Sequence, residues 1–281
     1  MANGRAGDPD HALELLWRAR ERESRPGLSL DGIVRAAVEL ADAEGLAGLS
    51  MRKVADRLGF TTMSLYRHVP GRDQLVDLMV DAVLGEHPDD IADEEGWRAR
   101  LETAARQAWR IRGRHPWLAE VRGTRHLPGP NAVAHYDYML STLTGTALTP
   151  AEMLAVVGMV GRFVDAEALR LLEIRHEERR SGMSEADWWG ARDTLYDRLD
   201  RYPTISALWE AGGWDAPEDP FEFGLRRLLD GVQVLIGQRD ESSDESCEVC
   251  GGPLESTTSG RPRVYCSHAC RQRAYRRRRP D

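Results

Sequence analysis

Hydrophobic residues recur at helical spacing along most of this chain. After Ser29, apolar side chains repeat every three or four positions until Gly45, which predicts an amphipathic helix with a polar cap at its start and a glycine at its end. Similar runs follow up to residue 240, separated by glycines and prolines, and none alternates apolar and polar residues as a half-buried strand does. The pattern therefore predicts an all-α fold.

One stretch, residues 49–69, predicts two short helices joined by a tight turn. Ser50 stands at an N-cap position ahead of an apolar run with helical spacing, and Gly59 stands where a helix can end in the left-handed conformation. Phe60 would then fill the turn as an apolar plug. The second helix would run from one of the threonines at 61–62 to the end of the stretch.

The second helix of this pair has two distinct faces. Leu65 and Val69 are four residues apart and would face inward. The outward residues offer hydrogen-bonding groups: Thr62, Ser64, Tyr66, Arg67 and His68. Two-helix units also occur as purely structural elements, but no fold requires these polar side chains together on one face. We therefore favour a helix-turn-helix whose second helix enters a DNA major groove.

The surrounding pattern divides the chain into four parts. Residues 28–75 would form a three-helix DNA-binding domain, and a further helix is expected from Arg72 to Leu84 after the Pro70–Gly71 break. Residues 1–27 would form an N-terminal arm, either a partly ordered tail or a basic segment lying along DNA. Residues 76–240 would form a helical domain and residues 241–281 a C-terminal module.

The helical domain is expected to follow an acidic linker at 88–95. Thr149, Pro150 and Glu152 give the N-cap, the N1 proline and the N3 glutamate of a helix start. The expected helices are Trp97–Arg112, His115–Val121, Asn131–Leu143, Pro150 to about Arg180, Glu185–Arg201 and Phe221–Gly237.

Charge is distributed unevenly along the chain, whose net charge is −8. Residues 24–72 carry seven basic and five acidic groups, whereas residues 73–240 carry 19 basic and 30 acidic groups. Residues 241–281 are again net basic, with eight arginines between 261 and 279. Two basic ends flanking an acidic middle suit a protein whose ends meet phosphate.

The chain shows no sign of a membrane segment or an export signal. No apolar run reaches the roughly 18 residues that a membrane span needs, and the first residues lack the features of a secretory leader. We therefore expect a cytoplasmic protein with no membrane partner.

The helix-turn-helix residues resemble those of the TetR family of bacterial transcriptional regulators. The resemblance rests on Gly48–Ala55, Leu65–Val69 and Gly71-Arg72, and it continues into the branch typified by the tetracycline repressor through Arg114–Leu118, Thr149–Glu152 and Phe221–Val232. It implies a DNA-binding head followed by a helical domain that dimerises and binds an effector.

The resemblance also assigns individual DNA contacts. It places Ser50, Arg52, Tyr66, His68 and Arg72 on phosphates, and Thr61, Thr62, Met63, Ser64 and Arg67 on bases. Arg67 has donors for guanine, and Met63 offers only apolar contact, for example to a thymine methyl. His68 could instead be a buried structural histidine.

The resemblance further implies a homodimer on a palindromic operator, because one head covers only a half-site. The dimer helices would be 150–180 and 221–238. The effector pocket would be lined by Trp109, Trp117, Met139 and Phe163, although taken singly each of these is more typical of a core residue. The positions that hold the magnesium chelate in the tetracycline repressor fall on Val121 and near Arg170, which cannot ligate Mg²⁺.

All four cysteines lie in the last 35 residues: Cys247, Cys250, Cys266 and Cys270. An even number allows disulfides, but two close pairs in a cytoplasmic protein favour a structural zinc site made of four thiolates. His268 is a possible substitute ligand. Ser267 would cap a helix whose first turn supplies Cys270.

The C-terminal module resembles small zinc-ribbon or treble-clef modules, which TetR regulators do not ordinarily carry. Its arginines surround Tyr275, and it would be joined through a linker at 238–246. Two interpretations remain open: a second DNA-contacting module tethered near the operator, or a protein-contact module with a solvated arginine helix.

These features together predict a dimeric transcriptional regulator, a repressor released from DNA by a small molecule. No P-loop, GxSxG, HExxH or dinucleotide fingerprint suggests an enzyme. The alternative is a zinc-containing interaction scaffold with a structural helix-turn-helix, which would leave the polar face of the second helix without a purpose.

Overall fold

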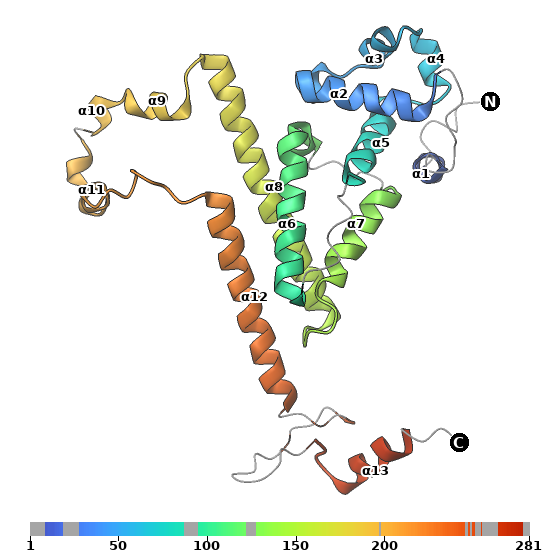
Figure 1. Ribbon diagram of the computed structural model, residues 1–281, viewed down its shortest axis with the longest axis vertical. Helices are drawn as coiled ribbons and strands as arrows, with labels where there is room; N and C mark the ends of the chain where they lie inside the picture. Colours follow the sequence, from blue (N-terminus) through green and yellow to red (C-terminus); the bar gives the residue numbers. More distant parts are fainter. Residues whose placement is uncertain are drawn as a thin grey trace.

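The computed structural model describes residues 9–18, 28–86, 95–121, 128–196, 198–244, 247, 249–250, 254 and 264–277. All regular secondary structure in these residues is helical, which confirms the all-α prediction. The molecule is elongated, with the helix-turn-helix at one end of its long axis and the last helix at the other (Figure 1).

The N-terminal domain consists of α1 (Pro9–Arg18), α2 (Leu30–Gly48), α3 (Met51–Leu58), α4 (Thr62–Tyr66) and α5 (Arg72–Leu84). Ser29 caps α2, because its hydroxyl accepts from the Gly32 N–H at 3.1 Å. Gly45 has φ +72°, so the expected end of this helix is a kink followed by one more turn.

The helix-turn-helix forms largely as the sequence predicts. Ser50 caps α3 by accepting from the Lys53 N–H, and Gly59 ends α3 with φ +73°. The second helix is shorter than expected: α4 ends at Tyr66, and the N–H groups of His68 and Val69 then close a turn onto the Leu65 carbonyl. Phe60 is 43% exposed, so it does not plug the turn.

The helix expected in the N-terminal arm forms as α1 and packs onto the DNA-binding domain. Leu16 is buried in the same core as residues of α2 and α5. The indole of Trp17 donates to the carbonyl of Pro128 at 3.3 Å, which ties α1 to the segment before α7. The arginines at 20 and 22, which would make the arm basic, lie outside the described residues.

The second domain is built from α6 (Gly96–Arg114), the 3-10 helix η2 (Pro116–Val121), α7 (Pro130–Ser141), α8 (Pro150–Ser181) and α12 (Pro220–Asp244). Its core joins α6, α7, α8 and α12. α8 begins with the predicted capping box, in which the Thr149 hydroxyl and the Glu152 carboxylate satisfy each other's backbone N–H groups. Most of the acidic linker at 88–95 lies outside the described residues.

Two expectations for this domain were wrong. The single helix expected at 185–201 is three short pieces, α9 (Glu185–Gly190), α10 (Asp193–Tyr196) and η3 (Leu199–Arg201), and α11 (Pro203–Glu210) follows them. These pieces project beside the bundle and bury no side chain of α9 or α11, so no neighbour stabilises one continuous helix (Figure 1). The linker expected at 238–246 is helical as far as Asp244.

The two domains share α5. This helix crosses the expected boundary between residues 75 and 76, and it packs on α2 in the first domain and on α7 in the second. A rigid helix that spans the boundary joins the two domains mechanically. No helix in the described part of the chain is long and apolar enough to cross a membrane.

Candidate functional site

α4 presents one anchoring face and one open face. Leu65 and Val69 are completely buried and fix the helix to the domain core. On the other side Met63 is 72% exposed and Tyr66 is 45% exposed, and Arg67 is also exposed. This segment is therefore held by two apolar side chains and offers its remaining side chains to a partner.

Local hydrogen bonds organise that open face. The hydroxyls of Thr61 and Ser64 lie 3.0 Å apart, and the Arg67 guanidinium donates to the Ser64 hydroxyl at 3.2 Å. Thr62, Ser64 and His68 are half-buried. A donor held in one direction loses less conformational entropy on binding, which suits recognition of a base edge.

The basic residues near α4 differ in their exposure and in their ion pairs, and therefore in their availability to bind DNA phosphates. The side chain of Arg52 is 86% exposed and only 3.8 Å from the exposed Asp56 carboxylate, a weak surface pair. Ser50 precedes Arg52 by two residues and caps the same helix, α3. Lys53 and Arg57 are bound to carboxylates of α2 at 2.6 and 2.8 Å.

Arg72 has a structural role that sequence reasoning missed. Its Nη2 donates to the Leu46 carbonyl at 2.8 Å and its Nε to the Leu49 carbonyl at 3.2 Å. These carbonyls lie at the end of α2 and in the loop before α3. Arg72 therefore fastens the start of α5 to the helix-turn-helix, besides being exposed near it.

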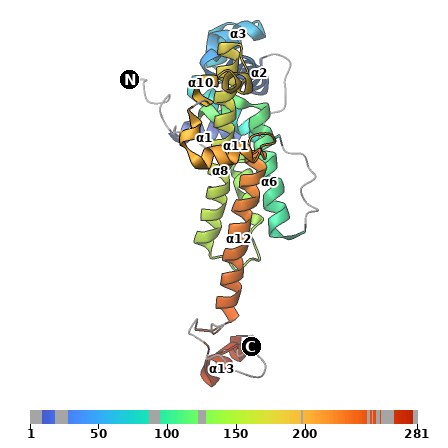
Figure 2. The same ribbon diagram turned by 90° about the vertical axis from the view of Figure 1, so that its left-hand side faces the viewer.

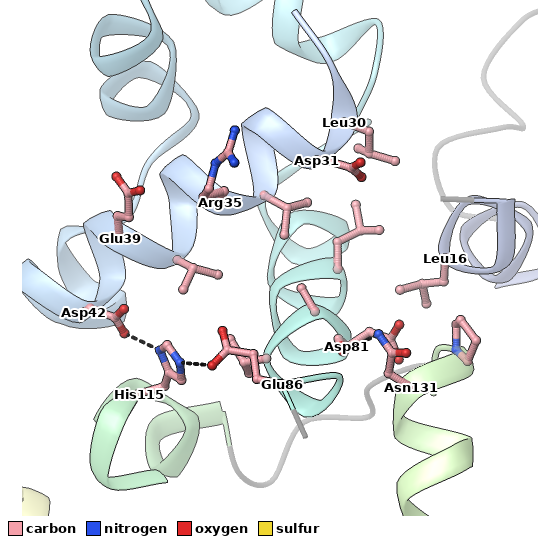
Figure 3. Close-up of a pocket in the computed structure, with 16 residues that line it drawn as sticks. Leu16, Leu30, Asp31, Arg35, Glu39, Asp42, Asp81, Glu86, His115 and Asn131 are labelled. Carbon is pink, nitrogen blue, oxygen red and sulfur yellow. Dashed lines mark hydrogen bonds and ion pairs between the residues drawn. The ribbon is translucent and has the colours of Figure 1, made fainter. Parts of the chain in front are cut away.

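A polar network at the domain junction was also missed. His115, which is buried, contacts Asp42 of α2 at 2.8 Å through Nδ1 and Glu86 at 3.2 Å through Nε2 (Figure 3). The indole of Trp117 donates to the same Asp42 oxygen at 2.8 Å. His115 at the end of α6 and Trp117 on η2 therefore connect the second domain directly to α2.

A second junction contact joins α5 to α7. Asp81 is buried, and its carboxylate accepts from the Ala132 N–H at 2.9 Å in the first turn of α7. Gly129 packs so closely on Asp81 that a Cβ would lie 2.3 Å from its carboxyl carbon. Between the two junction contacts lies a cavity of about 470 Å³, lined by α1, α2, α5, His115 and the start of α7 (Figure 3).

Three of the four expected pocket residues lie in one core and the fourth lies elsewhere. Trp109 stacks on Phe221 with ring centroids 4.5 Å apart, and Phe163 stacks on the same ring at 5.8 Å. Met139 is buried in that core. Trp117 is 1% exposed and packs instead in the core of the DNA-binding domain.

Gln107 is an additional candidate for ligand contact in the second domain. It is 5% exposed on α6, and its amide nitrogen has no hydrogen-bond partner in the described part of the chain. A buried donor without an acceptor costs roughly 1–3 kcal/mol, which a ligand acceptor would recover. A single glutamine within a helical run gives no such signal from sequence alone.

The four cysteines converge into one cluster, with all their sulfurs within 4.8 Å of one another. Cys250 and Cys266 are 3.4 Å apart, and Cys266 and Cys270 are 3.7 Å apart, so no disulfide links them. Four sulfurs at about 2.3 Å from a shared zinc would be roughly 3.8 Å apart. Ser267 caps α13 (His268–Arg277), because its hydroxyl accepts from the Cys270 N–H.

Ionisation of the clustered thiols is uneven without a cation. The Cys266 N–H donates to the Cys247 sulfur and lowers the pKa of that thiol to about 6. The neighbouring cysteine sulfurs, with Cys250 first, raise the pKa of Cys266 to about 12. Four thiolates so close together require a positive charge among them.

Comparisons with known proteins agree with both helical domains. Residues 33–79 match the family described as bacterial regulatory proteins, tetR family, and residues 89–236 match the tetracyclin repressor-like C-terminal domain. The HTH-type transcriptional repressor DrrR1 of Streptomyces coeruleorubidus is 43% identical over 83% of this chain and 89% of its own length. The cysteine cluster lies beyond both matched regions.

More distant relatives extend the likeness to a protein with a bound small molecule. The class A tetracycline repressor of Escherichia coli is 28% identical over 71% of this chain and 88% of its own. The structure of the Streptomyces coelicolor TetR family protein ActR in complex with actinorhodin matches with a TM-score of 0.63 and 28% identity. That match covers 76% of this chain and 99% of ActR.

Proposed function

Because the chain belongs to the tetR family of bacterial regulatory proteins, we propose that it is a homodimeric repressor that a small molecule releases from a palindromic operator. The observation that carries this proposal is the open face of α4, which two buried apolar anchors hold outward. As a DNA-binding regulator it would work in the bacterial cytoplasm. The family consists of transcriptional regulators, so we assign no catalytic role to any residue.

We assign the reading of the operator to α4 and its flanks. Arg67, already oriented by Ser64, would donate to guanine, and the exposed Met63 would meet a thymine methyl. Thr61 and Thr62 complete the base-facing group. Ser50, Arg52, Tyr66, His68 and Arg72 would meet phosphates, which fix the register of the helix and make binding sensitive to salt.

We infer that the dimer contact involves α8 and α12. These helices pack together, yet each keeps exposed apolar side chains: Leu154 is 51% exposed, Phe223 49% and Val234 60%. Phe223 and Val234 are eleven residues apart on one side of α12, and Gly231 lies between them. This apolar stripe is exposed in the single subunit. It is suited to pack against the same stripe of a second subunit related by two-fold symmetry.

We propose an aromatic effector with a hydrogen-bond acceptor. The stacked rings of Trp109, Phe163 and Phe221 offer flat apolar surface, and Gln107 offers the unpaired donor. Tetracycline bound through magnesium fits poorly, because by sequence resemblance the positions that would supply ligands to that chelate fall on Val121 and near Arg170, which cannot ligate Mg²⁺. The structure of ActR in complex with actinorhodin supports a small-molecule ligand for this type of domain.

We also propose that the cysteine cluster holds one structural zinc ion. Its support is geometric: four free thiols have the separations of a tetrahedral sulfur site. With four thiolates bound, zinc would keep no open position, so its role would be to hold α13 onto the end of α12. His268 is exposed and is not needed as a ligand.

A salt-dependent gel shift tests the regulator. The probe would be a short duplex that contains a palindrome from the DNA flanking the gene, with wild type, Tyr66→Ala and Tyr136→Ala compared. Tyr136 is the matched control, because it is 47% exposed but lies on α7. We expect Tyr66→Ala alone to lose at least tenfold in affinity, and equal losses in both variants would contradict the assignment of α4 as the reading element.

A further inference from the structure

α13 presents an arginine surface that lacks a partner in the described structure. Cys270 and Ala274 lie on the covered side of this helix, one turn apart. The rest of the helix surface carries exposed Arg271, Arg273 and Arg276, and Tyr275 is 61% exposed.

None of these three arginines forms an ion pair with any side chain that the structure describes. By contrast, Arg106, Arg112 and Arg239 in the second domain are each bound to a carboxylate. Among the residues that the structure describes, no carboxylate neutralises the positive charge of the α13 surface. Such a surface favours a polyanion.

The direction of α12 decides where that surface lies. Arg106 and Trp109, near the end of α6, contact Glu222 and Phe221 at the start of α12. Arg98, near the start of α6, binds Asp230 at 2.7 Å. α12 therefore runs antiparallel to α6 and away from the DNA-binding domain (Figures 1 and 2).

Helix lengths give the separation between the two basic surfaces. α6 has 19 residues and spans about 28 Å, and α12 continues beyond Asp230 to Asp244, about 21 Å further. Three residues from Asp244 to Cys247 add at most roughly 10 Å. α13 therefore lies on the order of 50 Å from the junction at His115, compared with a screening length of about 8 Å.

This separation excludes the interpretation that α13 is a tethered module binding the same operator as the helix-turn-helix. The segment expected to be a flexible linker is helical to Asp244, which leaves little chain for α13 to move back toward the operator. Both heads of a dimer must face one duplex, so both α13 helices would lie at the opposite end. The two α13 helices would therefore be accessible to a second molecule on the side away from the operator.

We propose that α13 is a second DNA-binding surface, with which the dimer bridges its operator to another DNA segment without reading that segment's sequence. This inference rests on the proposed function of the helix-turn-helix. Arginine forks match phosphate oxygens, and the regular phosphates of a duplex suit a helix that carries arginines around Tyr275. An acidic protein partner fits less well, because Tyr275 is the only large apolar side chain exposed on α13 to anchor an interface.

A bridging assay with the zinc-loaded full chain tests this proposal. Beads carrying a short operator duplex would be saturated with protein, washed, and offered a labelled duplex without operator sequence. We expect capture by wild type, and about tenfold less capture by the triple variant Arg271→Gln, Arg273→Gln and Arg276→Gln, because several phosphate contacts are lost. The matched control carries the same three changes at exposed Arg175, Arg179 and Arg201.

Two further measurements make the outcome unambiguous. The α13 triple variant should keep the wild-type zinc content and the wild-type affinity and salt slope for a single short operator duplex. Bridging would be overturned if both triple variants captured the second duplex equally well. It would also be overturned if the α13 triple variant bound the single operator duplex more weakly and with a smaller salt dependence. Selective loss of binding to a polyglutamate column with DNA capture intact would instead assign α13 to an acidic protein. Failure of wild type to bind any operator, with direct capture of the second duplex intact, would refute only the proposed function.

Discussion

Replacing Asp42 with alanine should loosen the junction between the two domains. One oxygen of Asp42 accepts from both Trp117 and His115 at 2.8 Å. Trp117 is 1% exposed but the Asp42 side chain is 31% exposed, so water can replace the lost acceptor of the indole only in part. His115 is also buried but keeps its contact with Glu86 on the other ring nitrogen.

The magnitude follows from these two donors. An unsatisfied buried donor costs roughly 1–3 kcal/mol, and solvent beside the partly exposed Asp42 reduces this cost for the Trp117 indole and for His115. We expect Asp42→Ala to lower the free energy of unfolding by about 2 kcal/mol. Asp42→Asn keeps an acceptor for the indole, so it should lose less.

Glu39→Ala is the matched control on the same helix. Glu39 binds Arg57 at 2.8 Å, but both side chains are about half exposed, so the loss should be at most about 1 kcal/mol. Urea denaturation would be followed by tryptophan fluorescence at one fixed protein concentration, because a dimer's stability depends on concentration. If Asp42→Ala and Glu39→Ala lose equal stability, the junction network does not hold the domains together.

Three further predictions concern other parts of the molecule. Leu65→Ala should cost roughly 2–5 kcal/mol, because Leu65 is fully buried, whereas Met63→Ala should leave the unfolding free energy within about 0.5 kcal/mol and weaken operator binding. Denaturation and gel shifts of both variants check this, and a stable Leu65→Ala would contradict the packing. Arg239, and then Thr149, lower the pKa of Glu152 to about 2, so this carboxylate stabilises the fold above about pH 4.5 and its contribution is lost as the pH falls toward 2. The Tm difference between wild type and Glu152→Gln should therefore shrink on acidification, and a constant difference would show that the pair is not formed. Removing zinc with a chelator should abolish the helical circular dichroism of α13, because the four thiols no longer share a cation, while affinity for a single short operator duplex stays unchanged.

Local features of the fold could be predicted from the sequence because they depend on residues that are close together in the chain. Ser29, Ser50 and Thr149 cap helices as their positions predict, and Gly59 takes the left-handed conformation at the end of α3. The two faces of α4 follow from the spacing of Leu65 and Val69. The clustering of the cysteines likewise follows from their two close pairs.

Contacts between distant segments could not be predicted from the sequence. Hydrophobic periodicity shows that one face of a helix is buried, but not which other element buries it. Trp117 was expected with Trp109 in an effector pocket, but it packs against the DNA-binding domain. The backbone contacts of Arg72 and the orphan amide of Gln107 depend on where other elements lie. The segment 185–201 has helical spacing but no core to cover, so it breaks into short pieces.

The sequence alone thus determined the helical class, the helix-turn-helix with its outward residues, and a basic module with four cysteines at the end of the chain. The tertiary structure decided how these parts act together. The junction at Asp42 connects the domains because residues 73 positions apart meet there. The helix α12 runs away from the DNA-binding domain and stays helical to Asp244, so the arginines of α13 lie at the opposite end of the molecule from α4.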